Sequence, residues 1–185
     1  MSITIHFFRN RSLERIDYEK LIDYFDSMET CHINYYEDVV EMVYTDPVFD
    51  FPYRFLITKR SQVKSIYNLN VDYFNINLLV EIPILLPSYV TRCVLAFIMD
   101  VCKTFELEIY YEGIKNIEPF DMTGLMMFME KEKMYFIEEH PEQEIFFEDR
   151  EKLTQICQYQ QMMPYLPSKI KDEATINPYI VMNDN

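Results

Sequence analysis

The segment 73–105 constrains the fold of this chain most strongly, because the spacing of its apolar residues changes partway along it. Over residues 73–82 apolar and polar side chains alternate, which predicts a strand in a sheet with one solvent-facing side. Ser88 then provides a good helix N-cap, and apolar residues beyond it recur at helical spacing. We therefore predict a long strand followed by a helix over 89–105.

The rest of the chain shows the same two apolar patterns. Alternation predicts strands at 3–9, 32–36, 39–45, about 53–60 and 107–111, and helical spacing predicts helices over about 13–28, 119–139 and 149–162. This order contains the β-α-β-β-α-β pattern of a ferredoxin-like sandwich with one or two additional strands. We therefore predict an α+β fold of that type. Residues 1–113 would form the sandwich domain, and residues 114–185 a helical extension and extended tail packed on the same domain.

The segment 45–52 is predicted to be a loop, because it holds two prolines. A proline cannot donate a hydrogen bond to the ladder of a central strand. This loop carries Phe49 and Phe51, two large apolar side chains that we expect to contact a partner.

Glycine is too scarce for several familiar catalytic designs, since the chain has only Gly113 and Gly124. A phosphate-binding loop, a dinucleotide fingerprint and a nucleophile elbow each need glycines at closer spacing. The three histidines and four cysteines show no metal-ligand spacing. We therefore expect no cofactor and no metal site, and no residue stands out as catalytic.

Charge is unevenly distributed along this acidic chain, whose formal net charge is −14. Residues 1–93 carry nine bases and thirteen acids, whereas residues 94–185 carry eight and eighteen. Nine of the later acids lie between positions 130 and 151, where we expect a solvated helix face; the alternative is a docking surface for a basic partner. One basic run contains no acid: Arg54, Lys59, Arg60 and Lys64.

The basic run permits two interpretations. If it converges in space with the three arginines between positions 9 and 15, it forms a positive patch for a phosphate-bearing ligand, RNA or an acidic protein surface. Alternatively, these side chains are solvated charges that balance nearby acids. Nucleic acid would be a partner only through this local patch, because the chain as a whole repels phosphates.

The sequence shows no signal for the membrane. Its first residues lack a basic region followed by a long apolar stretch, and the most apolar run, 76–105, is interrupted by charges and prolines. We therefore expect a cytoplasmic protein.

By elimination, the sequence favours a non-enzymatic protein-interaction or adaptor module, part of a larger assembly. Its contact features would be Phe49, Phe51 and the basic run. Two alternatives stay open: a small-molecule or nucleotide-acting enzyme whose site is assembled from scattered residues, and an RNA-associated protein. The enzyme would need a pocket with convergent polar groups, whereas the interaction module would need an exposed patch.

Overall fold

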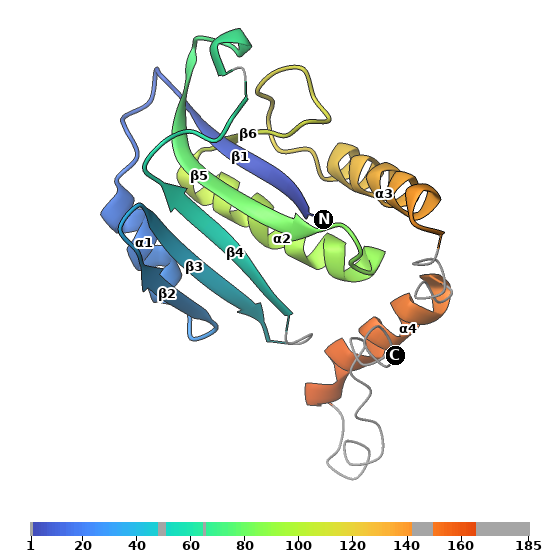
Figure 1. Ribbon diagram of the computed structural model, residues 1–185. Helices are drawn as coiled ribbons and strands as arrows, with labels where there is room; N and C mark the ends of the chain where they lie inside the picture. The colour runs from blue at the N-terminus through green and yellow to red at the C-terminus, as the bar shows by residue number, and fades with distance from the viewer. Residues whose placement is uncertain (1, 48–50, 65, 142–149, 166–185) are drawn as a thin grey trace.

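The computed structural model describes residues 2–47, 51–64, 66–141 and 150–165. Within these residues the protein is a mixed α+β structure with one antiparallel sheet, ordered β2-β3-β4-β5-β1-β6 (Figure 1). The strands are β1 (Ser2–Asn10), β2 (Cys31–Tyr35), β3 (Val39–Asp46), β4 (Phe51–Thr58), β5 (Tyr73–Pro83) and β6 (Glu108–Tyr110). The helices are α1 (Tyr18–Asp26), α2 (Ser88–Phe105), α3 (Met122–Glu139) and α4 (Arg150–Met162), with short 3-10 turns at Ile66–Asn68 and Met163–Tyr165.

The strand order does not confirm the ferredoxin-like topology, although the α+β class is correct. The strands joined by α2, β5 and β6, are separated by β1 alone, as in a split β-α-β unit. The strands joined by α1, β1 and β2, are instead separated by β5, β4 and β3. The additional hairpin strands therefore lie inside the sheet, and β2 becomes its edge.

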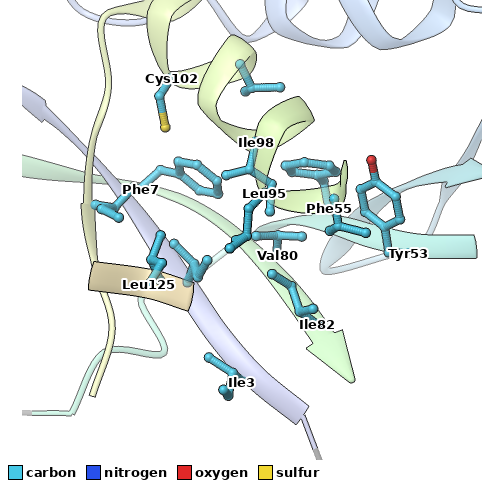
Figure 2. Packing of buried hydrophobic residues seen from close by; sticks show 14 of the residues in the cluster. Ile3, Phe7, Tyr53, Phe55, Val80, Ile82, Leu95, Ile98, Cys102 and Leu125 are labelled. Atoms are coloured by element: carbon cyan, nitrogen blue, oxygen red, sulfur yellow. The ribbon is translucent and has the colours of Figure 1, made fainter. Parts of the chain in front are cut away.

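Helices α1 and α2 pack against the same face of the sheet, which lies behind the strands in Figure 1. Alternate side chains of β1, β4 and β5 point to this face and interdigitate with α2. Figure 2 shows the centre of this core, where Phe7, Phe55 and Val80 meet Leu95 and Ile98. All five side chains are fully buried, and burial of each contributes about 1.5–3 kcal/mol.

Helix α1 begins later than its apolar spacing predicts. The side chain of Asp17 accepts hydrogen bonds from the backbone amides of Glu19 and Lys20, so Asp17 is the N-cap. Ser12, the residue before the predicted start of the helix, instead donates its backbone and hydroxyl protons to the side chain of Asn10. The apolar pattern locates the helix, but capping chemistry decides where it starts.

The prediction of a loop over 45–52 is wrong at both ends. Strand β3 continues to Asp46, and β4 already begins at Phe51, with Pro52 paired opposite Thr45. Phe51 packs against the core beside Tyr53, so it is not an exposed loop residue. Phe49 lies outside the described residues.

The second face of the sheet is covered only in part. The connection from β4 to β5 crosses it (Figure 1). Val63 and Leu69 from this connection pack on Phe8 together with Ile117. This small cluster covers the part of the face formed by β1 and β6. Along β2, β3 and β4 no described helix packs on this face, and we call that surface the open face.

The C-terminal helices pack on the helical layer. Leu125 and Met129 of α3 are buried in the same core as the sheet. Helix α4 packs on α2, where the Tyr89 hydroxyl and Gln161 form a hydrogen bond. Within the described residues, every helix is too short or too polar to cross a lipid bilayer.

Candidate functional site: a polar groove at β1 and β6

Cross-strand register aligns side chains in rows over the sheet face opposite the helices. One row follows the pairing of successive strands from β2 to β6 and contains Asn34, Glu41, Leu56, Leu79, His6 and Tyr110. The neighbouring row contains His32, Val43, Arg54, Glu81 and Thr4. Both rows follow from the two-residue period of strands, which places alternate side chains on this face.

On the open face, the Arg54 guanidinium pairs with two carboxylates, which neutralise its charge. Its Nη1 lies 3.3 Å from Oε1 of Glu41 on β3, and its Nη2 lies 2.9 Å from Oε2 of Glu81 on β5. The guanidinium thus joins three strands through charge-assisted hydrogen bonds. Glu41 also accepts a hydrogen bond from the amide of Asn34, which extends the network to the edge strand.

The other members of the basic run lie beside carboxylates of other elements. Lys59, just after β4, lies 2.8 Å from Asp38 in the β2–β3 turn, and Lys64 lies 3.6 Å from Glu112 beyond β6. Arg60 is exposed, next to Lys59. These basic side chains therefore act as counter-charges to carboxylates along the sheet.

The arginines near the end of β1 form polar contacts that stabilise the fold. The Arg9 guanidinium donates to the backbone carbonyls of Phe105 and Glu14, and it also pairs with Glu106. It thereby holds the C-terminal end of α2 against β1. Arg11 donates to the carbonyl of Tyr73.

A groove of about 290 Å³ lies where the first row ends at β1 and β6. Its walls are the first half of β1, the connection at 62–64, the residues after β6 and one side of α3. Several polar or charged side chains line it: Thr4, His6, Gln62, Lys64, Tyr110, Glu112 and Glu132. Among the predicted binding residues that the structure describes, Lys64 is the one that lines this groove.

Burial sets the protonation of His6. Desolvation lowers the pKa of the imidazole below its usual value, and the nearby Glu112 carboxylate partly opposes this shift. The ring stacks beside Tyr110, with 6.4 Å between ring centroids. His6 is therefore a neutral hydrogen-bonding group at pH 7.

A glycine allows the aromatic wall of the groove to form. A Cβ atom at Gly113 would overlap the ring of Phe128 on α3 and the ring of Tyr111. The two rings pack together, 4.9 Å between centroids, in the space that the missing side chain leaves. One of the two glycines thus positions Phe128 at the groove.

The His6 imidazole is expected to titrate below its usual pKa of 6.5 in an NMR pH titration. In Glu112→Gln the midpoint should fall further, because the carboxylate that favours the imidazolium is lost. The matched control is Glu37→Gln, which removes one carboxylate from the β2–β3 turn, distant from the groove and from its other charged residues, Lys64 and Glu132. An unchanged midpoint in Glu112→Gln would refute the assigned coupling.

The lowered pKa of His6 also determines how the free energy of unfolding changes with pH. Between the lowered folded pKa and the unfolded value of 6.5, the unfolded chain binds the proton at His6 more readily than the folded chain. The free energy of unfolding therefore decreases as pH falls through this window. His6→Gln should remove that part of the decrease.

The scattered groups that an enzyme could use do not meet at this groove. Cys31 and His32 lie on β2, four strand spacings of about 4.8 Å, or roughly 19 Å, from His6 on β1. Their side chains point to opposite faces of the sheet, with Cys31 packed against the core. In the described ranges, no three His, Cys, Asp or Glu side chains gather closely enough to hold a metal ion.

The alternation that predicts a strand at 3–9 implies that His6 lies on the face opposite Ile5 and Phe7, which is where the structure has it. Sequence reasoning alone gave no indication of the rest of the groove. It missed Tyr110, Glu112, Phe128 and Glu132, which come from two elements distant in the sequence. The outward position of a histidine on the first strand was the one available signal.

Together the fold and the groove define an antiparallel α+β protein with helices on one face of the sheet, an open face over β2–β4 and a polar groove at β1 and β6. No family model, curated protein or solved structure matches this chain.

Proposed function

We propose that the protein is a non-enzymatic module that binds another protein through the open face formed by β2, β3 and β4. The observation that carries this proposal is the one-sided helical layer of the sheet. Strands that form a hydrophobic core on one face leave a broad, rigid surface on the other. Such a surface suits a protein partner, which docks on an area rather than in a cavity.

The chemistry of the open face supports this function. It combines Arg54 and Val43 with Tyr36 at the tip of the β2–β3 hairpin, a side chain that is 62% exposed. Tyrosine and arginine are enriched at protein interfaces. The Tyr36 hydroxyl lies 3.4 Å from Glu41, which connects the hairpin tip to the network around Arg54.

RNA binding receives less support from the same geometry. Arg54, Lys59 and Lys64 each lie beside a carboxylate, which a phosphate would have to displace. The net charge of −14 adds a general repulsion of nucleic acid. A neutral protein surface with its own hydrogen-bonding groups avoids much of this cost.

The test places a charge on the open face. Val43→Glu should abolish partner capture, because it places a new carboxylate opposite Arg54, where it competes with Glu41 and Glu81 for the guanidinium and adds negative charge to the open face. Met127→Glu, a comparable apolar-to-acid change on exposed α3, is the control. The measurement is crosslinking with mass spectrometry of wild type and both variants in native lysate.

We expect the wild type and Met127→Glu to capture the same partner, with crosslinks that map to β2–β4, and Val43→Glu to lose it. Circular dichroism should show that both variants remain folded. Loss of capture in Met127→Glu with retention in Val43→Glu would move the interface to the helical side and overturn the proposal.

A further inference from the structure

We infer that the groove around His6 accepts one lysine or arginine side chain of the partner protein. This inference rests on the proposed function, because the groove continues the row of side chains that crosses the open face. It adds a specific recognition site to a broad docking surface.

The lining of the groove is complementary to a cation. Glu112 and Glu132 reach it from opposite walls, one after β6 and the other on α3. Carboxylates form strong charge-assisted hydrogen bonds with ammonium and guanidinium groups. Tyr110 and Phe128 add aromatic rings, which attract a cation placed over their faces.

Lys64 already places a cation at this position. Its Nζ lies 3.6 Å from Oε1 of Glu112, and its side chain is 90% exposed. An exposed ion pair of this kind is weakly held, because water and salt screen it. Lys64 can therefore swing out and leave Glu112 to a cation from the partner.

The groups that face His6 keep the groove favourable for a cation at neutral pH. His6 itself is neutral there, since its burial disfavours the imidazolium. The charged groups on the surrounding elements are Lys64, Glu112 and Glu132, so two acids face one displaceable base. Protonation of His6 would add positive charge and weaken cation binding.

The size of the groove indicates a side chain as the occupant. A volume of about 290 Å³ lies at the lower limit of the cavities that hold drug-sized ligands, which begin at about 300 Å³. An extended lysine or arginine side chain needs much less space than a nucleotide. The overall charge of −14 also raises the local concentration of cationic groups at the surface.

The test uses a short, capped glycine peptide that carries one lysine, titrated into the full-length protein and followed by NMR. The expected shifts centre on His6 and Tyr110. Glu112→Gln should weaken binding roughly twofold to fivefold, the loss expected when one exposed ion pair is removed. Lys64→Gln should tighten binding, because the competing internal cation is removed. Glu37→Gln is the control for net charge, since it removes one acid from the distant hairpin turn.

Two results would overturn the inference. Equal weakening by Glu37→Gln and Glu112→Gln would show attraction by net charge alone. Tighter binding of free spermidine than of the peptide, with the same dependence on Glu112, would assign the groove to a small polyamine and not to a protein side chain.

The same peptide separates this inference from the proposed function. Val43→Glu lies outside the groove and should leave peptide affinity within about twofold, since an exposed charge beyond the Debye length of about 8 Å is largely screened. If the peptide fails to bind while Val43→Glu still abolishes partner capture, the groove is not the recognition site and the open face keeps its proposed role.

Discussion

Replacing Phe55 with alanine is expected to lower the free energy of unfolding by about 4 kcal/mol, the loss typical of a buried phenylalanine. The side chain is fully buried at the junction of β4 with both covering helices. Its ring centroid lies 4.9 Å from that of Phe25 on α1, 5.9 Å from Phe97 on α2 and 6.1 Å from Phe7 on β1. Truncation would leave a cavity among rigid rings that cannot collapse into it (Figure 2).

Urea unfolding followed by circular dichroism would measure this loss, and the melting temperature should fall by roughly 8–16 °C, at 2–4 °C per kcal/mol for a chain of this size. Tyr67→Ala is the matched control, because its ring is 95% exposed and its loss should stay within about 0.5 kcal/mol. Phe55→Leu should cost less than about half of the alanine change, since it keeps most of the buried volume. Similar losses for Phe55→Ala and Tyr67→Ala would contradict the central place of Phe55 in the core.

The elements with strong local patterns could be predicted from the sequence. The strand β5 and the helix α2 appear where the change in apolar period placed them, and the β2–β3 hairpin lies on either side of the expected turn. These patterns suffice because each element buries one face, and the period of that face is recorded in consecutive residues.

The order of strands could not be predicted in the same way. The residues of β2 do not indicate whether the strand pairs with β3 alone or also with β5, and this pairing determines the topology of the sheet. The predicted start of β4 was also wrong. Pro52 reads as a strand breaker, but a strand accepts a proline at its beginning.

The candidate site depends even more on tertiary structure. The sequence identified Lys64 through its positive charge, whereas the structure gives it a role through Glu112, which lies far along the chain. Acidic residues between positions 130 and 151 look equivalent in the sequence. In the structure Glu132 lines the groove, and Glu130 contributes to a polar contact beneath α3 that also holds a buried lysine.

That lysine, Lys133, gives the second large effect that we expect. Its side chain is 5% exposed, and its Nζ lies 2.7 Å from the carbonyl oxygen of Leu86 and 3.2 Å from Oε1 of Glu130. Glu130 also accepts a hydrogen bond from the hydroxyl of Ser88, the first residue of α2. Lys133 therefore joins α3 to the segment between β5 and α2 and compensates a carboxylate that is largely removed from water.

Lys133→Met should lower the free energy of unfolding by about 3 kcal/mol, because it keeps the apolar stem but leaves the carbonyl and the carboxylate without this donor. The melting temperature should fall by roughly 6–12 °C in a thermal scan. Lys131→Met removes the same charge from an exposed position two residues earlier in α3, where the ammonium lies over the ring of Tyr135. It should cost about 1 kcal/mol or less.

The double variant Glu130→Met/Lys133→Met separates the two causes of the loss. If the cost of Lys133→Met comes from the buried carboxylate losing its lysine, replacing both partners by apolar side chains should restore much of the stability. If it comes from the lost hydrogen bond to Leu86, the double variant should be at least as unstable as the single one. The first result is expected, since desolvating a charge costs more than leaving one carbonyl unpaired.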